Sequence, residues 1–174
     1  MSLPIYLIGA RGCGKTTVGE ALSCALGYAF KDTDHHLQLV TQRSVTQIVA
    51  EEGWEGFRAR ESESLHAVTA PATIIATGGG MVLAEHNRRY MREQGQVIWL
   101  SAPPHILAQR LENQPEAAQR PTLTGRPIAE EMSDVLLERA HLYRSAAHHE
   151  VSAMQPPEYV VEAILHSLSL ARAS

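Results

Sequence analysis

Cysteine is scarce in this sequence, and no disulfide framework can be built from it. The 174 residues contain two cysteines, Cys13 and Cys24, whereas small secreted domains held together by disulfides carry many more. Because Cys13 lies inside a glycine-rich loop described below, we expect a reduced, cytoplasmic setting for this protein. The first apolar segment begins within four residues of Met1, so we also expect no secretory signal peptide.

The sequence also lacks an excess of positive charge and any long apolar run. Its formal net charge is −4 at pH 7, which disfavours a general binding surface for nucleic acid or for membranes. No apolar run approaches the roughly 20 residues of a membrane-spanning helix. We therefore expect neither kind of partner, and an anionic ligand would have to be held by a few locally placed cations.

Internal repeats, low-complexity linkers and regularly spaced metal-binding histidines are missing as well. Two adjacent pairs, His35-His36 and His148-His149, lack the i,i+4 spacing of paired helical ligands, which favours surface residues over a metal site. A hydrophobic content of 44% is ordinary for a globular protein. We expect one domain over residues 1–174 and, without an oligomerisation signal, a monomer.

What the sequence does contain, close to its start, is a phosphate-binding motif. Residues 5–8 are apolar, residues 9–16 read G-x-x-x-x-G-K-T, and residues 17–26 are compatible with a helix. Glycines let successive backbone N–H groups point at phosphate oxygens, and the helix N-terminus adds partial positive charge. In this motif Lys15 reaches the outer phosphates and the Thr16 hydroxyl ligates Mg²⁺. The sequence thus predicts a protein that binds a nucleoside triphosphate.

Apolar segments of strand length alternate with longer helical patterns along the chain. The predicted strands are residues 4–8, 29–31, 73–76, 97–100 and 149–152. The predicted helices are residues 15–26, 35–41, 45–51, 55–68, 85–93, 104–111, 129–146 and 158–170. This alternation predicts an α/β fold, a three-layer sandwich with helices on both faces of a parallel sheet.

One segment, residues 112–127, interrupts the alternation. It contains three prolines, Gly125 and two arginines, with little apolar periodicity. A loop of this length in a compact domain is usually functional or mobile. We therefore predict a lid, with Arg120 as its working residue.

Candidate catalytic groups follow the second and third predicted strands. If the strand continues, Asp32 and Asp34 share one face, so that one carboxylate can hold Mg²⁺ and the other can accept a hydroxyl proton. The alternative is a polar turn in which Asp34 caps the next helix. Residues 78–80 are three glycines, which permit close approach of a small ligand or simply form a flexible turn. No aspartate ends the third strand, which shifts the metal role to Asp32.

The roles of Arg58 and Cys13 depend on whether the helix and the loop that carry them face the site. Arg58 and Glu61 are spaced i,i+3, so that Glu61 can orient the guanidinium if Arg58 faces the cleft. Trp54 and Phe57 fit either a core or a pocket wall. Cys13 precedes a helix N-terminus and neighbours Lys15, which favours a reactive thiolate, although an inert thiol packed inward explains the residue equally well.

Taken in order, the motifs resemble a known family. They are the phosphate loop at 9–16, Asp32-Thr33-Asp34, Gly56-Phe57-Arg58-x-x-Glu61, Thr77-Gly78-Gly79-Gly80, Arg120-Pro121 and Glu138-Arg139-x-x-x-Tyr143. This ordered set is similar to that of the shikimate kinase family, in its isoenzyme 2 type. The resemblance implies a phosphate-loop kinase fold with sheet order 2-3-1-4-5, a mobile lid and a substrate-binding helical segment at about 33–61. It also implies transfer of the γ-phosphate of ATP to the 3-hydroxyl of shikimate, in chorismate and aromatic amino-acid synthesis.

The resemblance further implies a role for each matching position. The residues expected at ATP are Gly12, Cys13, Gly14, Lys15, Thr16, Thr17, Arg110 and the lid residue Arg120. The residues expected at shikimate are Asp34, Arg58, Gly79, Gly80 and Arg139. Thr16 and Asp32 would serve Mg²⁺, and Asp34, Lys15 and Arg120 would act in catalysis. Arg110 would flank the adenine opposite residues 153–157. The segment 151–155, which reads V-S-A-M-Q, lacks the acidic residue and the threonine that are usual in the family.

Two other functions are weighed against this one. Another small-metabolite kinase of the same architecture, for gluconate or a nucleoside monophosphate, shares the phosphate loop, but two separated arginines that can meet one carboxylate favour shikimate. A nucleotide-dependent switch of the GTPase type would carry N-K-x-D and D-x-x-G, and neither string occurs.

Overall fold

The computed structural model describes residues 2–113 and 128–173, with side chains omitted at 128, 129 and 170–173. The predicted lid lies outside this part of the chain from residue 114 onward, and so does Arg120. The strands are β1 (Ile5–Ile8), β2 (Ala29–Asp32), β3 (Thr73–Ala76), β4 (Gln96–Ser101) and β5 (His149–Ser152). The helices are α1 (Lys15–Leu26), α2 (Thr33–Thr41), α3 (Val45–Val68), the 3₁₀ helix η1 (Met81–Leu83), α4 (Glu85–Gln94), α5 (Pro104–Glu112), α6 (Ile128–Ala146) and α7 (Pro157–Ala173).

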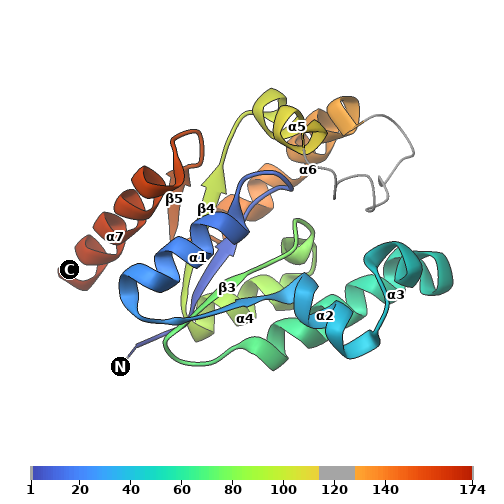
Figure 1. Ribbon diagram of the computed structural model, residues 1–174, viewed down its shortest axis with the longest axis horizontal. Coiled ribbons are helices and arrows are strands. Elements are labelled where there is room, and N and C mark those ends of the chain that lie inside the picture. Colours follow the sequence, from blue (N-terminus) through green and yellow to red (C-terminus); the bar gives the residue numbers. More distant parts are fainter. Residues whose placement is uncertain (1, 114–127, 174) are drawn as a thin grey trace.

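All five strands are parallel and pair in the order β2-β3-β1-β4-β5, which confirms the predicted sheet (Figure 1). The central strand β1 pairs on both sides, with Leu7 opposite Ala76 of β3 and Ile98 of β4. Because the strands are parallel, their carboxyl ends meet at one edge, and the phosphate loop leaves the middle of that edge. Among the described residues, no helix combines the length and apolar character needed to span a bilayer.

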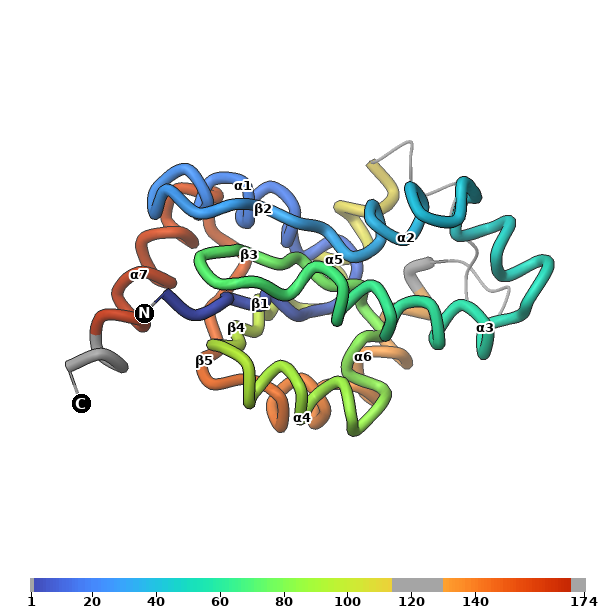
Figure 2. Tube along the Cα trace, turned by 90° about the horizontal axis from the view of Figure 1, so that it is seen from below, coloured from blue at the N-terminus to red at the C-terminus, as the bar shows by residue number. Residues whose placement is uncertain are grey.

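Helices cover both faces of the sheet and complete three layers (Figure 2). Alternate residues of β1 supply the two cores, with Ile5 and Leu7 on the face packed against α1, α5 and α7. Tyr6 and Ile8 point to the other face, which packs against α3, α4 and α6. Burial on both faces explains why this strand reads as a continuous apolar run rather than an alternating one.

Helix α2 and the N-terminal part of α3 form a separate unit beside the sheet, with its own small core of Leu37, Val45, Ile48 and Phe57. The C-terminal part of α3 packs on the sheet through Leu65 and Val68. The two helices predicted for 45–51 and 55–68 are continuous in α3 but meet at a kink at Gly53, where φ is 75° and ψ is 175°. This backbone conformation is open essentially only to glycine. Helix α2 begins two residues earlier than predicted, because Asp32 rather than Asp34 caps it.

Candidate active site

The phosphate loop between β1 and α1 is shaped by glycine. Gly9, Gly12 and Gly14 have φ values of 148°, 86° and 91°, in the region that other residues rarely adopt. A Cβ on Gly12 would lie 2.8 Å from the carbonyl oxygen of Leu107, so the α5 backbone also requires glycine there. Gly14 is the N-cap of α1 and offers no side-chain cap, which leaves the first-turn N–H groups available to an anion.

Lys15 lies over the loop that it would serve. Its ammonium group donates to the carbonyl oxygens of Gly9 at 2.6 Å and Ala10 at 3.2 Å, and it lies 3.7 Å from the Cys13 sulfur. To reach a bound phosphate, the ammonium must exchange these carbonyls for phosphate oxygens. The Cys13 side chain is 2% exposed and packs in the core beside α1, as the inert-thiol interpretation expects.

A hydroxyl and a carboxylate meet next to the phosphate loop. The Thr16 hydroxyl donates to Oδ2 of Asp32 over 3.1 Å. The other oxygen of Asp32 accepts the backbone N–H groups of Asp34 at 2.9 Å and His35 at 3.2 Å. Asp32 therefore fixes the start of α2 with one oxygen and faces Thr16 with the other. Among the described residues, no group of three or more His, Cys, Asp and Glu gathers at a point.

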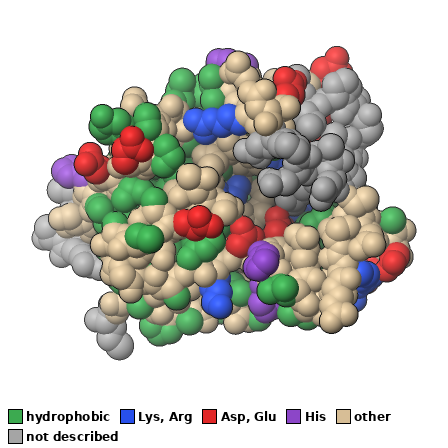
Figure 3. Space-filling model, viewed as in Figure 1, with side chains coloured by type: hydrophobic (Ala, Val, Ile, Leu, Met, Phe, Trp, Pro, Cys, Tyr) green, Lys and Arg blue, Asp and Glu red, His purple; other side chains and the backbone are tan. Residues whose placement is uncertain are grey.

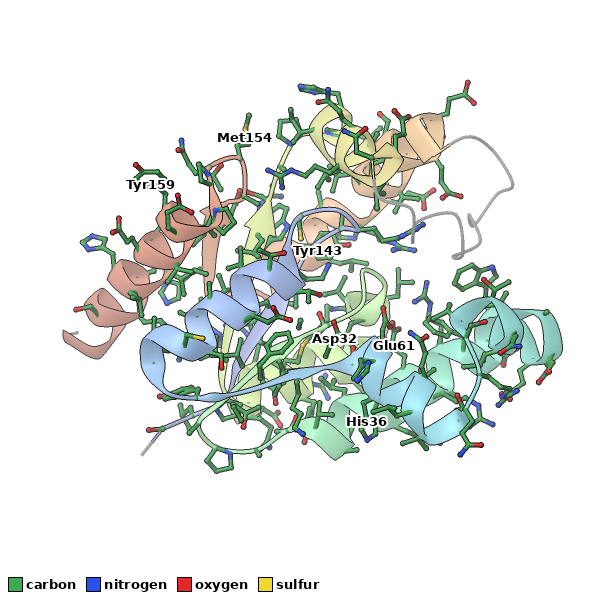
Figure 4. All side chains as sticks on the ribbon, in the orientation of Figure 1. Asp32, His36, Glu61, Tyr143, Met154 and Tyr159 are labelled. Carbon is green, nitrogen blue, oxygen red and sulfur yellow. The ribbon has the colours of Figure 1, made fainter. Side chains whose placement is uncertain are left out.

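Asp34 reaches the same space from a different direction than the sequence argument assumed. The strand ends at Asp32, so Asp34 occupies the first turn of α2 rather than an extension of β2. A Cβ on Gly78 would lie 2.5 Å from Glu61 Oε2 and 3.2 Å from Asp34 Oδ1. The first glycine of the triplet thus makes room for two carboxylates, and Figure 4 shows Asp32 and Glu61 facing this region.

Arg58 is fixed on three sides by neighbours of different chemistry. Its guanidinium donates to Glu61 at 3.1 Å, and Glu61 is only 1% exposed. The guanidinium carbon lies 5.2 Å from the Trp54 ring and 5.3 Å from the Phe57 ring. A Cβ on Gly80 would overlap the guanidinium. The sequence-based pairing of Arg58 with Glu61 is therefore present, and Trp54 and Phe57 both contact the arginine.

The other predicted substrate arginine, Arg139, comes from α6 and is 9% exposed. One turn later, fully buried Tyr143 donates its hydroxyl to the Gly79 carbonyl oxygen over 2.6 Å. Burial raises the pKa of Tyr143, while the charge of Arg139 and its hydrogen bond to the tyrosine act in the opposite direction. Sequence reasoning included Tyr143 in a motif but gave it no role, and its i,i+4 spacing from Arg139 was the available signal.

Two cavities meet at the phosphate loop. The first, of about 460 Å³, is lined by Arg11, Gly12, Gly14, Lys15, Thr16, Thr17, Asp32, Asp34, Ala76, Thr77, Gly78, Gly79 and Leu111. The corresponding face of the molecule is hollowed, with basic and acidic side chains both visible (Figure 3). Arg58 and Gly80 line another space, of about 480 Å³, between α3 and α4. The first cavity thus brings together the phosphate loop, Asp32, Asp34 and the first two glycines of the triplet.

The second cavity, of about 440 Å³, lies on the other side of the loop, between Arg110 and residues 153–157. Arg110 donates to the Ala153 carbonyl oxygen over 2.7 Å and lies 3.4 Å from the Gly12 carbonyl oxygen. Met154, labelled in Figure 4, is exposed at this rim. A flat base could enter between the arginine and the proline-containing loop, because both offer broad surfaces for stacking.

Comparisons with known proteins agree with this geometry. A family model described as shikimate kinase matches residues 11–169. Shikimate kinase 2 of Erwinia tasmaniensis is 68% identical over 174 residues and covers 100% of both chains. Shikimate kinase 2 of Pectobacterium carotovorum subsp. carotovorum is 58% identical over 99% of this chain and 100% of the relative.

Solved structures give the same picture. The shikimate kinase of Acinetobacter baumannii in complex with shikimate superposes with a TM-score of 0.91 at 34% identity, over 99% of this chain and 95% of that one. A gluconokinase from Sinorhizobium meliloti reaches a TM-score of 0.56 at 20% identity, over 97% of this chain and 92% of that one. At that identity the gluconokinase shares the fold and nothing more specific.

Proposed function

The chain belongs to the shikimate kinase family, and we infer that it transfers the γ-phosphate of ATP to the 3-hydroxyl of shikimate. The observation that carries this inference is the meeting of two sites at one sheet edge. A phosphate loop opens on one side of a cavity that Asp34, Gly78 and Gly79 line on the other. Phosphoryl transfer requires this positioning of donor and acceptor more than it requires covalent chemistry from the protein.

We propose that ATP extends from the second cavity into the first. The base would stack beside Arg110, and the phosphates would follow the N–H groups from Gly12 to Thr17. Arg110 already bonds both to the loop after β5 and to the phosphate loop. This arginine would therefore couple the position of the base to that of the phosphates.

The residues present suit a Mg²⁺ ion accompanying ATP. Thr16 and Asp32 offer a hydroxyl and a carboxylate oxygen 3.1 Å apart, and hard oxygen donors are what Mg²⁺ prefers. Two protein groups are also the usual number where substrate phosphates and water complete the coordination. When bound, Mg²⁺ would neutralise charge on the phosphate oxygens. Thr16 and Asp32 would hold the ion while Asp32 continues to cap α2.

We propose that Arg58 and Arg139 together bind the carboxylate of shikimate. The chain has a net charge of −4, so an anionic substrate depends on local cations. Arg58 is held by Glu61, Trp54 and Phe57, and Arg139 is held in the largely buried face of α6. Fixed planar guanidinium groups lose little entropy when they bind a carboxylate, which favours them over lysines here. Gly79 and Gly80 would let the sugar-like ring approach the backbone.

In the proposed reaction, Asp34 accepts the hydrogen bond of the attacking hydroxyl and aims its lone pair at the γ-phosphorus. Lys15 leaves the carbonyl oxygens of Gly9 and Ala10 and places its charge on the transferring phosphate. Arg120, which lies outside the described residues, is proposed to add a second positive charge from the lid. These groups stabilise charge that develops on phosphate oxygens during transfer.

We propose a monomeric, cytoplasmic enzyme. Every group assigned above is supplied by one chain, so the site requires no partner subunit. The free thiols of Cys13 and Cys24 suit a reducing compartment in which ATP is available. Light scattering of the purified protein, with and without substrates, checks the subunit number.

A substrate panel tests the proposed function against its nearest rival. The purified chain is assayed for ADP release with Mg²⁺ and ATP in the presence of shikimate, gluconate or a nucleoside monophosphate. Release that depends on shikimate alone is the expected result. Release that depends on one of the other acceptors would assign a different kinase activity, and acceptor-independent release that requires a partner protein would point to a switch.

A further inference from the structure

Tyr143 is buried where α6 passes the glycine triplet, and the established chemistry of phosphoryl transfer gives it no task. We propose that its hydroxyl is a positioning group that sets the Gly79–Gly80 peptide, beside Arg139, for binding of the acceptor substrate. This inference rests on the proposed function, because Gly79, Gly80 and Arg139 matter only if the acceptor binds beside them.

The ring of Tyr143 is held in place by close packing. It is fully buried and stacks on Trp99 of β4, with ring centroids 5.7 Å apart and planes inclined by 24°. Figure 4 places it in the interior, where α6 lies close to the strand ends. Such a packed aromatic ring has no alternative rotamer available. The hydroxyl therefore occupies a defined point next to the substrate loop.

From that point the hydroxyl reaches the substrate loop. It donates to the carbonyl oxygen of Gly79 over 2.6 Å. Burial raises the pKa of this hydroxyl, and the positive charge of Arg139, four residues earlier on the same helix face, acts to lower it. The hydroxyl thus joins α6, which carries Arg139, to a backbone group that follows β3. The two segments are 64 positions apart in the sequence.

The bond to Gly79 matters because three successive glycines have little conformational preference of their own. A trans peptide is planar, so the carbonyl group of Gly79 and the N–H group of Gly80 point in opposite directions. When Tyr143 holds the carbonyl toward α6, the Gly80 N–H is directed away from α6. Loss of the hydroxyl removes this restraint and lets the peptide rotate.

The chain supplies a matched control in Tyr6. That residue is also fully buried, and its hydroxyl shares a 2.9 Å hydrogen bond with Thr69. It lies on β1, on the side of the sheet that contacts α3 rather than at the substrate loop. Removing the Tyr143 hydroxyl leaves the buried carbonyl oxygen of Gly79 without this donor, whereas Thr69 is only partly buried and keeps its own hydrogen bond to Leu65 after Tyr6→Phe. Both variants lose one hydrogen bond of a buried tyrosine, and Tyr6→Phe should lower the midpoint of thermal unfolding by no more than Tyr143→Phe does.

The test is steady-state kinetics of wild type, Y143F and Y6F with Mg²⁺, ATP and shikimate. Y143F is expected to raise the KM for shikimate roughly tenfold, the effect of losing about one well-placed hydrogen bond. Its KM for ATP should stay unchanged, and Y6F should keep both constants. Replacement of Tyr143 alone by 3-fluorotyrosine restores a hydroxyl and should return the shikimate KM to within about twofold of wild type.

The possible failures are distinguishable. A Y143F protein whose shikimate KM equals that of wild type would overturn the inference while leaving the proposed function intact. If the KM for both substrates rose equally in Y143F, or if the KM for shikimate rose as much in Y6F as in Y143F, the role of Tyr143 would be packing alone and the inference would be wrong. A wild-type protein that does not phosphorylate shikimate would remove the proposed function and this inference together.

Discussion

At the scale of single residues, the two aspartates after β2 have different surroundings and should respond differently to neutralisation. Asp34→Asn keeps the shape but removes the negative charge that strengthens the hydrogen bond from the attacking hydroxyl and can take up its proton, so kcat should fall by about 10²–10⁴-fold with MgATP affinity retained. Asp32→Asn should raise the Mg²⁺ concentration needed for half-maximal rate, and added Mg²⁺ should restore part of the activity. Measuring the rate of both variants as a function of Mg²⁺ concentration tests this assignment. If added Mg²⁺ restored the activity of Asp34→Asn instead, Asp34 would be the metal ligand and Asp32 the residue at the attacking hydroxyl.

Arg58 is expected to depend on its planar fork as well as its charge. Arg58→Lys keeps the charge but cannot bond to Glu61 and a carboxylate with two parallel N–H groups, so the Kd for shikimate should rise roughly tenfold or more. The Kd for ATP should not change. Arg60→Lys is the control, because Arg60 pairs with Glu52 rather than Glu61. Isothermal titration with each ligand measures both constants. If only the affinity for ATP fell, Arg58 would be reassigned to binding of the ATP phosphates.

The residues at the sheet edge were largely predictable, but their geometry was not. The phosphate loop, Asp32, Asp34, Arg58 and Gly80 could be named because each follows a recognisable strand or motif. The sequence could not reveal that Asp32 ends its strand as a cap, which places Asp34 on a helix instead of on the same strand face. The contact of Tyr143 could not be predicted because its partner, the Gly79 carbonyl, is a backbone group that carries no sequence signal.

At the scale of elements, the kink in α3 determines the direction in which Arg58 leaves the helix. Gly53 separates the two helical halves, and one ion pair, from Glu52 to Arg60, crosses it. Glu52 also pairs with Arg43, which precedes the kink as Glu52 does. The guanidinium groups of Arg60 and Arg43 lower the pKa of Glu52 to about 2. Glu52 therefore stays charged throughout the neutral range, and its ion pair across the kink persists.

Replacing Gly53 by alanine tests this element directly. A Cβ there meets no atom within 4 Å, so the change acts only through a backbone conformation that costs about 1–3 kcal/mol for alanine. Gly53→Ala should lower the free energy of unfolding by that amount and raise the KM for shikimate, because Arg58 lies little more than one turn away.

Gly27→Ala is the matched control for the kink. Gly27 also has positive φ and open space around its missing Cβ, but it ends α1 away from the acceptor site. Its substitution should cost about 1 kcal/mol and leave the shikimate KM unchanged. Urea denaturation and kinetics of both variants separate strain from positioning, and an unchanged KM in Gly53→Ala would mean that the kink does not direct Arg58.

Element boundaries were predicted well wherever the hydrophobic period was strong. The five strands and most helices fall within a few residues of their predicted limits, because buried parallel strands and amphipathic helices each produce a clear pattern of apolar residues in the sequence. The exceptions are local. The halves of α3 are joined across a glycine, which sequence rules treat as a helix end. The short helix η1 follows the glycine triplet through backbone bonds such as that from Met81 N–H to Gly78 O.

At the scale of the whole molecule, one histidine links folding stability to pH. His148 precedes β5, and its Nδ1 accepts the backbone N–H of Val97 in β4 over 3.0 Å. Burial lowers its pKa, and the positive charge of Arg92 acts in the same direction. The unfolded chain therefore binds a proton at higher pH than the folded one. This contribution to stability is complete above about pH 6.5, the usual value for histidine, and is lost as pH falls through the folded pKa.

His148→Asn keeps an acceptor in place of Nδ1 but cannot titrate, so it should flatten the fall in stability between pH 7.5 and pH 5. His166→Asn, at an exposed position on α7, should leave the wild-type profile unchanged. The measurement is the free energy of unfolding in urea at several pH values. An identical acid loss in His148→Asn would show that the carboxylates, rather than this histidine, determine the profile.

The global arrangement also explains how an acidic chain can bind two anionic substrates. Lys15, Arg58, Arg110 and Arg139 come from four different elements, and the parallel sheet brings them to one edge. Sequence composition reports only the sum of charges, which is −4. The fold gathers these four cations, next to the carboxylates of Asp32, Asp34 and Glu61, and this arrangement depends on topology rather than on composition.

The most direct test of the account is the fate of the γ-phosphate. The purified protein is incubated with Mg²⁺, ATP and shikimate while ³¹P NMR follows the phosphorus signals. We predict that the γ-phosphate signal is replaced by a phosphomonoester signal coupled to the proton on carbon 3 of shikimate, in equal amount to the ADP formed. Conversion of the γ-phosphate to inorganic phosphate alone, with shikimate unchanged, would contradict the account.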